Sequence, residues 1–283
     1  MSELVHNVTI VFVSYRSKKK ILKYVEKIFL NFKIIIIENS DDKSIINENV
    51  NKNCKIHFVN NLGYGSSINY ARKHVETEYF VVINPDIQGI DESGIKKFYE
   101  VAKKLNNDFS CLGPRYTNIS SKTLKQSNKN KEIDTLKSIS GAMMFFNIKK
   151  FDLLNGFDEN FFLYFEETDF SYRGNSIGLK AYQVNSIALE HIVGTSVDFK
   201  DIEEEKKIRD LYTWHFIWSK FYFFKKHYGL FLTYMYFLPI FLRSVVKFLF
   251  FYLMFNHKRK KKYWIRLSGL LSSIRGLKSF KRI

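Results

Sequence analysis

Four short apolar runs, rich in β-branched side chains, constrain the first 86 residues more than any other feature. These runs are residues 8–13, 33–37, 55–59 and 79–83. Apolar runs of this length, bounded by turn signals, are typical of strands that a parallel sheet buries on both faces. Residues 17–29 and 66–74, which lie between runs, have helical patterns. We therefore predict an α/β fold with a mostly parallel sheet and helices on both faces.

Polar turns follow the second, third and fourth of these runs directly. The turns are residues 38–42, 60–65 and 84–86. In open α/β sheets, ligands bind outside the carboxyl ends of the strands, where such turns lie. Three polar turns at one edge are more than a sheet needs for its own connections. The sequence therefore predicts a binding site at this edge.

The third turn reads Asn84-Pro85-Asp86 and offers a carboxylate directly after a buried strand. Carboxylate oxygens are ligands that Mg²⁺ and Mn²⁺ prefer, so Asp86 can hold a divalent cation. A structural alternative stays open, since Pro at the second position favours a type I turn and Asp can cap a following helix.

A long acidic and aromatic stretch covers residues 156–173 and reads G-F-D-E-N-F-F-L-Y-F-E-E-T-D-F-S-Y-R. At helical spacing Glu166, Asp169 and Arg173 share one face, and Glu167 projects elsewhere. One carboxylate can then pair with Arg173 while another acts as a general base. The structural alternative is that these acids stabilise the dipole of a helix that begins there.

Three further positions have both a functional and a structural interpretation. His191, which follows a predicted strand at 180–189, can complete a metal site with Asp86, contact a phosphate, or serve structure alone. Glu38 opens a turn that can contact a nucleotide base or is a solvated acidic turn. Gly63, in N-L-G-Y-G, allows the backbone to approach a nucleotide or belongs to an ordinary turn before a helix.

The C-terminal part differs sharply in charge from the rest of the chain. Residues 200–283 contain 19 of the 45 basic residues but only 5 of the 28 acidic ones, and no acid follows Asp210. A near-neutral body with a basic, aromatic tail indicates an anionic membrane surface rather than nucleic acid. We therefore expect two parts, a domain at 1–200 and a basic helical region at 201–283.

The expected helices of this region begin at Asp201, and Gly229 is expected to end the first of them. Residues 230–255 are long enough to span a bilayer. However, Arg243 in the middle costs about 2.5–3.5 kcal/mol on insertion scales, and Pro239 is expected to kink the helix. We favour a helix that lies in the membrane interface, with a span as the alternative. A solvated basic face on an ordinary core helix is the structural interpretation.

Several local expectations complete the outline. The opening residues 1–5 are polar and are expected to lead directly into a strand, without a signal peptide. Residues 94–105 have a helical pattern, and residues 116–134 are expected to form a mobile loop. Two cysteines without metal-type spacing indicate a reduced setting.

Taken in order, these segments resemble the family 2 glycosyltransferases, and most closely the rhamnosyltransferase-type branch that builds bacterial surface polysaccharides. The matching segments are V-T-I-V-F-V-S-Y, I-I-I-I-E-N-S-D-D, N-L-G-Y-G-S-S-I-N-Y-A, V-V-I-N-P-D-I, S-G-A-M-M-F-F, the 156–173 stretch and E-H-I-V-G-T-S. They span about residues 8–197. The 156–173 stretch is the most specific of them.

The resemblance implies a GT-A fold and a metal-dependent, inverting displacement at the anomeric carbon. It implies that Asp86, matching the second acid of the D-x-D motif, holds Mg²⁺ or Mn²⁺ with His191. It also implies a nucleotide site, formed by residues that match the nucleotide-lining segments of the family: Ser14, Tyr15, Glu38, Asn61, Gly63 and Asn84.

For the base, the branch usually reads E-D-x-D, and this chain has Glu167 where the second residue is Asp. We expect Glu167 to be the base, with Glu166 as the alternative and Asp169 beside them. The expected donor is a nucleotide sugar such as dTDP-rhamnose, and the expected acceptor is a lipid-linked saccharide. We expect a peripheral enzyme at the cytoplasmic face of the bacterial inner membrane, possible homo-oligomers, and no nucleic-acid partner. The alternative function is a non-catalytic nucleotide-binding protein whose basic tail recruits a partner at the membrane.

Overall fold

A computed structural model describes the chain except for residues 1, 41, 48–51, 121–125, 128–130 and 283. The described residues divide into two compact units. The first contains residues 1–158 and 166–198, and the second contains residues 159–165 and 199–283. The short segment 159–165, which the sequence places within the first domain, therefore belongs to the helical unit.

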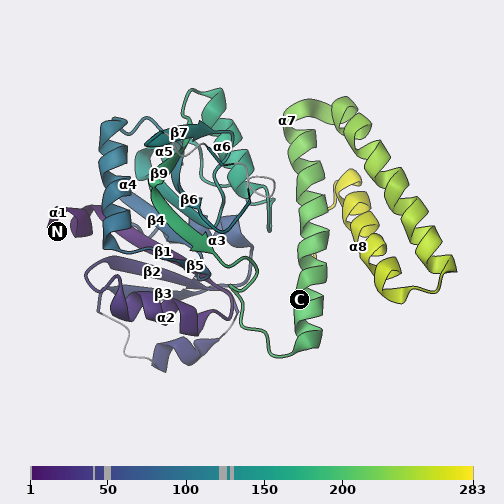
Figure 1. The fold of residues 1–283 in the computed structure, drawn as a ribbon, viewed down its shortest axis with the longest axis horizontal. Coiled ribbons are helices and arrows are strands. Elements are labelled where there is room, and N and C mark those ends of the chain that lie inside the picture. Colours follow the sequence, from purple (N-terminus) through teal and green to yellow (C-terminus); the bar gives the residue numbers. More distant parts are fainter. Residues whose placement is uncertain (1, 41, 48–51, 121–125, 128–130, 283) are drawn as a thin grey trace. The chain divides into compact units, whose positions relative to one another are not determined.

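The four predicted strands form the parallel part of one sheet in the first unit (Figure 1). They are β1 (Val8–Ser14), β2 (Lys33–Glu38), β3 (Cys54–Phe58) and β4 (Tyr79–Ile83). The central strand β1 pairs with β2 on one side and with β4 on the other, and β3 pairs with β2. The turns that follow these strands consequently share one edge of the sheet.

The remaining described strands extend the sheet and make it mixed. They are β5 (Ile87–Gln88), β6 (Cys111–Tyr116), β7 (Ile133–Leu136), β8 (Met143–Asn147) and β9 (Ala181–His191). Strand β8 lies antiparallel between β4 and β6, whereas β6 and β9 are parallel. The short strands β5 and β7 each pair antiparallel with β9. The prediction of an α/β fold with a mostly parallel sheet is confirmed.

Helices cover both faces of this sheet. They are α2 (Lys18–Lys27), α3 (Tyr64–Arg72), α4 (Glu92–Lys104), α5 (Ile148–Leu153) and α6 (Glu166–Ser176). Side chains alternate across a strand, so Phe12 and Val11 of β1 enter different cores. Phe12 packs in the core that contains Phe98 of α4, and Val11 in the core that contains Phe170 of α6.

One local expectation is wrong, and another falls partly outside the described residues. The opening residues form a short helix, α1 (Ser2–Asn7), before β1, so they do not lead directly into a strand. Of the expected loop at 116–134, residues 121–125 and 128–130 lie outside the described residues, and its last residues belong to β7.

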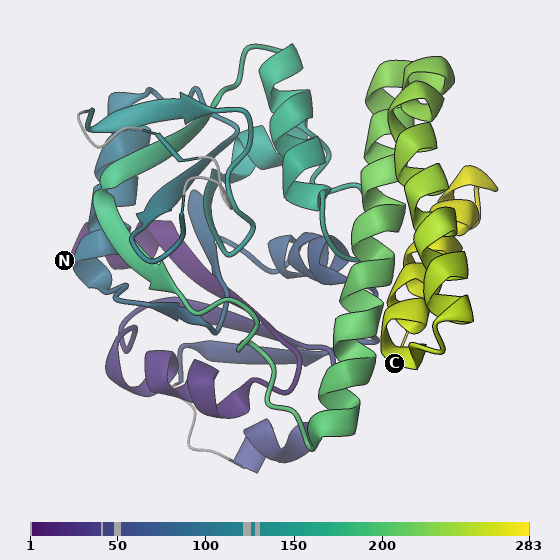
Figure 2. The ribbon, with the colours of Figure 1, turned by 45° about the vertical axis from the view of Figure 1, so that its right-hand side comes forward.

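The second unit is built from α7 (Ile202–Leu253) and α8 (His257–Ile274). Gly229 interrupts α7 with φ 77° and ψ 172°, a conformation that glycine adopts without steric cost. The expected helix end at Gly229 is therefore confirmed, and α7 consists of two halves (Figure 2). The helix continues through Pro239, because Gly229 is the one position in α7 with non-helical dihedrals, and the expected kink at this proline stays a prediction. Phe237 and Ile240 pack against the unit's core on either side of this proline and hold the helix in place.

Candidate active site

Asp86 and His191 meet at the edge of the sheet where β4 ends. The pairing of β5 with β9 sets Ile87 opposite His191, which brings the preceding Asp86 within reach of the imidazole. His191 Nε2 lies 3.4 Å from Asp86 Oδ1, and the backbone N–H of Ile192 donates to the carbonyl of Asp86 at 3.0 Å. The structure thus places side by side the two residues that the sequence assigns to a metal.

The carboxylate of Asp86 fits a cation. Its side chain is 2% exposed, and within the described part of the chain Oδ1 has no hydrogen-bond partner. A buried carboxylate oxygen without a partner is costly, and a bound cation would remove that cost. One oxygen and one imidazole nitrogen are suitable ligands for Mn²⁺. The described residues contain no group of three or more His, Cys, Asp or Glu that could hold a metal, here or elsewhere, so the donor phosphates and water would complete the coordination at Asp86 and His191.

The acidic pair begins α6 and is withdrawn from solvent. Glu166 is 4% exposed, and its Oε2 has no hydrogen-bond partner among the described atoms. Burial raises the pKa of Glu166 well above its usual range, and the neighbouring charge of Glu167 adds to the effect. Glu167 is half-buried, accepts a hydrogen bond from the Thr168 hydroxyl at 3.1 Å, and has a pKa that burial also raises. Raised pKa values make both carboxylates stronger bases than a solvated glutamate.

Tyr64 connects the acidic pair with the metal pair. Its hydroxyl donates to the carbonyl of Gly141 at 2.7 Å. Burial raises the pKa of Tyr64, and the charges of Glu166, Asp86 and Glu167 contribute to the effect. A Cβ on Gly141 would lie 3.7 Å from the Tyr64 ring and in contact with Glu167, so Tyr64 and Glu167 border the same glycine.

Two glycines border the acidic pair. A Cβ at Gly141 would lie 3.8 Å from Cγ of Glu167, and one at Gly65 would lie 3.4 Å from Cβ of Glu166. Tyr64 and Gly141 were not predicted to be site residues. The feature of the sequence that could have pointed to them is their position inside two of the segments that resemble the family, N-L-G-Y-G and S-G-A-M-M-F-F.

Asp169 is engaged by Arg173 as the spacing suggested. Its side chain is fully buried, and Arg173 Nε lies 2.8 Å from Oδ2. The same guanidinium donates to the carbonyl of Gly156 at 2.7 Å and to that of Leu154. Asp169 therefore fixes α6 against the preceding loop. The ion pair leaves Glu166 and Glu167 as the carboxylates of α6 that are available for chemistry.

The residues expected to bind the nucleotide lie at the ends of neighbouring strands. Glu38 ends β2 opposite Ser14 of β1, is 1% exposed, and accepts a hydrogen bond from the Ser40 backbone at 2.7 Å. Burial raises the pKa of Glu38, although hydrogen bonds from the Ser40 backbone and hydroxyl offset part of the effect. A carboxyl group of this kind can accept a hydrogen bond from a nucleotide base and, when protonated, can donate one to it.

The other expected nucleotide residues form turns at the same edge. Asn61 Oδ1 accepts from the backbone of Gly63 at 3.3 Å, and Gly63, with φ 106°, begins α3. Tyr15 is half-buried, and Cζ of Arg16 lies over its ring, 5.6 Å from the ring centroid. Asn84 makes backbone hydrogen bonds to Ala142 and Ile87 and shapes the turn before Asp86.

Replacing Glu166 with glutamine should stabilise the protein at neutral and higher pH. Because the folded state raises the pKa of this carboxyl, stability falls as the pH rises from the ordinary carboxyl range through the raised pKa. Glu166→Gln removes that loss, and a gain on the order of 1 kcal/mol corresponds to about 2–4 °C in melting temperature. Thermal unfolding from pH 5 to pH 8 should show the gain growing with pH. The exposed Glu100→Gln is the control, and an unchanged or lower melting temperature at pH 8 contradicts the prediction.

Comparison with known proteins identifies the family of the chain. The glycosyl transferase family 2 model matches residues 9–174. A hexosyltransferase of low-salt glycan biosynthesis, Agl10 of Haloferax volcanii, is 21% identical over 213 residues, which are 66% of this chain and 68% of that protein.

Solved structures share the fold. Residues 1–349 of S. aureus TarS superimpose with a TM-score of 0.54 at 13% identity, covering 95% of this chain and 92% of that one. GalNAc-T7 with UDP, GalNAc and Mn²⁺ superimposes with a TM-score of 0.52 at 12% identity, covering 78% of this chain and 50% of that one. These similarities confirm the expected GT-A fold. Because the family model spans more than half of the sequence, the chain belongs to glycosyl transferase family 2.

Proposed function

We propose that this family 2 glycosyltransferase moves a sugar from a nucleotide donor to an acceptor hydroxyl in one inverting displacement, with Glu167 as the base. One observation carries the proposal: Gly141 lies against both Tyr64 and Glu167, and the next residue, Ala142, accepts a hydrogen bond from Asn84 beside Asp86, so a cation pair and a pair of strengthened bases border one site. Sugar transfer needs both, since the leaving diphosphate is anionic and the acceptor hydroxyl must lose a proton.

The roles follow from burial. Asp86 and His191 would hold Mg²⁺ or Mn²⁺, which when bound neutralises charge on the leaving diphosphate. Glu167 is half-buried and Glu166 is almost fully buried, so Glu167 is the one an acceptor hydroxyl can reach. Burial raises the pKa of Glu167 and thereby its basicity, and the charge of Glu167 in turn helps to keep the more deeply buried Glu166 protonated. The nucleotide would occupy the turns that contain Ser14, Tyr15, Glu38, Asn61, Gly63 and Asn84.

The donor is tested by binding and turnover together. The structure of S. aureus TarS in complex with UDP-GlcNAc has the same fold, with a TM-score of 0.54 at 14% identity over 96% of this chain and 92% of that one. Resemblance to the rhamnosyltransferase branch favours dTDP-rhamnose for this chain. Thermal unfolding with Mn²⁺ and a panel of nucleotide sugars should show one donor raising the melting temperature, because a ligand of the folded state stabilises it. Hydrolysis of that donor should require the metal. Binding without hydrolysis or transfer would instead support a non-catalytic nucleotide-binding protein.

We further propose that the second unit attaches the enzyme to a membrane, at the cytoplasmic face of the inner membrane, where a lipid-linked saccharide is the acceptor. The second half of α7 exposes large apolar side chains to solvent, including Phe231 at 74% and Leu253 at 72%. An 18-residue window of α7 has mean hydropathy 1.6, with only 11% of it buried. Exposed apolar surface on this scale is typical of membrane or protein contact. The adjoining basic residues 258–262 add attraction to anionic lipid.

Removing three exposed apolar side chains should abolish this attachment. Leu242, Val246 and Leu253 are 53%, 64% and 72% exposed and lie at helical spacing on α7. Changing all three to glutamine should weaken binding to vesicles of mixed neutral and anionic lipid by more than about a hundredfold, since burying each is worth about 1.5–3 kcal/mol. Co-sedimentation of the full chain measures this.

The matched control changes Leu30, Leu153 and Ile177, which are 50%, 60% and 55% exposed on the first unit, to glutamine. Vesicle binding of this control should equal that of the unaltered chain. Equal losses in the two triple variants would count against attachment through α7.

A further inference from the structure

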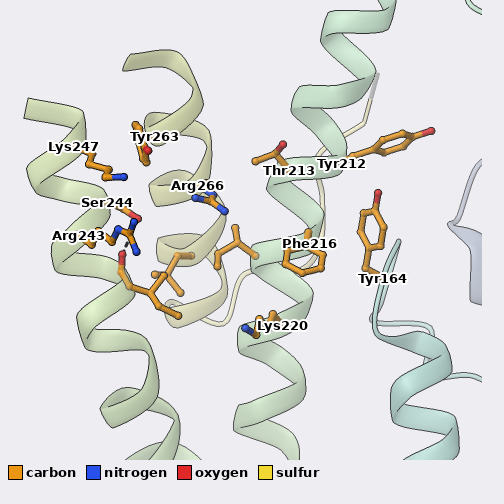
Figure 3. Close-up of a pocket in the computed structure, with 13 residues that line it drawn as sticks. Tyr164, Tyr212, Thr213, Phe216, Lys220, Arg243, Ser244, Lys247, Tyr263 and Arg266 are labelled. Atoms are coloured by element: carbon orange, nitrogen blue, oxygen red, sulfur yellow. Dashed lines mark hydrogen bonds between the residues drawn. The ribbon is translucent and has the colours of Figure 1, made fainter. Parts of the chain in front are cut away.

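A cavity of about 670 Å³ lies within the second unit, between the two halves of α7 and α8 (Figure 3). It falls in the size range of small-molecule sites, about 300–1,000 Å³. Four cationic side chains line it: Lys220 from the first half of α7, Arg243 and Lys247 from the second, and Arg266 from α8. Figure 3 shows Arg243 and Lys247 pointing toward Arg266. None of the lining residues is acidic.

The cations have little to neutralise them within the unit. Arg243 and Arg266 form no ion pair with any described residue, and no acid follows Asp210 in the sequence. Asp210 itself pairs with Lys261 at 2.7 Å. Like charges held in one concavity repel one another, so the arrangement costs free energy unless an anion enters.

Polar side chains beside the cations suit a multiply charged oxyanion. Lys220 Nζ donates to the Tyr236 hydroxyl at 2.9 Å, and Lys247 Nζ lies 5.4 Å from the ring centroid of Tyr263. These contacts hold the two ammonium groups in place. Guanidinium groups such as those of Arg243 and Arg266 bind phosphate oxygens in a bidentate way. Four cations exceed what a single carboxylate needs and match a phosphate or diphosphate.

The surroundings identify the source of the phosphate. Leu242 and Val246 are neighbours of Arg243 and Lys247 on the same half of α7 and are 53% and 64% exposed. They belong to the apolar surface that we propose to enter the membrane interface. A second groove of about 380 Å³ has almost entirely apolar walls, including Phe241 and Leu271, and shares Leu270 with the cationic cavity. A ligand here thus meets cations at one site and hydrocarbon-compatible surfaces beside it.

We propose that this cavity binds the phosphate or diphosphate headgroup of a membrane lipid, through Arg243, Lys247 and Arg266. The inference rests on the membrane attachment proposed above and is independent of the transferase chemistry. It gives the second unit a specific ligand in addition to a general attraction for anionic surfaces. A lipid held in this way would be retained at the enzyme between encounters with the donor.

The test compares vesicles of equal charge. Phosphatidylcholine vesicles contain either a polyprenyl diphosphate or enough phosphatidylserine to give the same surface charge, and co-sedimentation measures binding of the full chain. The unaltered protein should bind the diphosphate vesicles at least about tenfold more tightly, because charge-assisted, bidentate hydrogen bonds from the arginines to diphosphate oxygens add to the general attraction of a charged surface. Equal binding to the two kinds of vesicle overturns the proposal without any variant.

Charge-matched variants then locate the site. Arg243→Gln with Arg266→Gln should remove the preference for diphosphate. Lys258→Gln with Lys262→Gln removes the same charge from exposed positions of α8 that do not line the cavity, and it should lower binding to both vesicles while keeping the preference. Loss of the preference in the second pair as well, or its retention in the first, overturns the assignment.

Soluble pyrophosphate distinguishes a free anion from a lipid. Calorimetry without vesicles should show weak binding to the unaltered chain, and binding as tight as that to the diphosphate vesicles would overturn the lipid as the ligand. Donor hydrolysis is measured in the same preparations without lipid. If the chain prefers diphosphate vesicles but hydrolyses no donor, the lipid site stands and the proposed transferase function is contradicted. If it hydrolyses a donor but shows no preference for diphosphate vesicles, the transferase function stands and the lipid site is overturned.

Discussion

Glu167→Gln should lower the rate of sugar transfer by about 10²–10⁴, the usual contribution of a positioned general base. The amide preserves the size of the side chain and its contact with Thr168, but it cannot accept the proton of an acceptor hydroxyl. Donor binding should persist, because the nucleotide turns lie on other elements. Steady-state kinetics should therefore show a fall in kcat with little change in the KM for the donor.

The pH dependence of transfer supplies a second measurement of the same role. A base works only when deprotonated, so the rate should rise with pH through the pKa of Glu167. Burial raises that pKa, which moves the rising limb above the range of a solvated glutamate and toward neutral pH. Glu167→Gln should eliminate the limb, and Glu167→Asp should retain it at a reduced rate, because aspartate is shorter by one methylene.

Two controls show whether the effect belongs to the base itself. Glu100→Gln changes an exposed acid of α4 and should leave the rate unaltered. Glu166→Gln should leave the limb near its position in the unaltered chain, because burial and not the charge of Glu166 raises the pKa of Glu167. If Glu167→Gln keeps full activity while Glu166→Gln loses it, the base is Glu166, and the half-buried position of Glu167 does not identify the base.

The parts of the fold that could be predicted are those in which the pattern of the chain is local. Apolar runs marked β1, β2, β3 and β4, and Gly229 marked the interruption of α7. Each of these signals acts within a few residues, because strand and helix periodicities and backbone dihedrals are local properties.

What could not be predicted depends on contacts between distant residues. Strand β8 enters antiparallel between β4 and β6, although the chain offers no local signal for its partners. The segment 159–165 joins the helical unit through contacts such as Phe161 with Tyr222, at 4.9 Å between ring centroids. Pro239 is tolerated within α7 because packing on both sides outweighs one lost hydrogen bond.

The candidate site shows the same division. Asp86, Glu166, Glu167 and His191 have side chains whose chemistry stands out in a sequence. Tyr64 does not, because its place depends on a hydrogen bond to Gly141, 77 residues away. Residue type therefore identified the reactive groups, whereas the tyrosine between them became evident only in three dimensions. The cationic cavity of the second unit is a similar case, since Lys220, Arg243 and Arg266 come from three helical segments.

Asp86→Ala should remove the dependence of transfer on Mn²⁺ and lower the rate by about 10²–10³, the effect of losing one well-placed electrostatic contact in an active site. The carboxylate of Asp86 is buried, and one of its oxygens has no hydrogen-bond partner among the described residues. Its removal therefore breaks no described side-chain hydrogen bond. The melting temperature without metal should stay the same or rise, because a buried carboxylate oxygen without a hydrogen bond, 3.4 Å from the His191 imidazole, destabilises the fold.

Direct metal binding separates this prediction from a structural role. Titration of Mn²⁺ into the unaltered chain with nucleoside diphosphate, followed by electron paramagnetic resonance, should show a bound ion that Asp86→Ala lacks. Asp86→Asn keeps the shape of the side chain but halves its oxygen ligands and removes the charge, so it should bind the ion only weakly. His191→Ala should retain partial binding, because one of the two protein ligands remains. Transfer that is unaffected by a chelator in the unaltered chain, or Mn²⁺ binding that survives Asp86→Ala intact, would place the cation elsewhere and leave the unpartnered oxygen of Asp86 without a function.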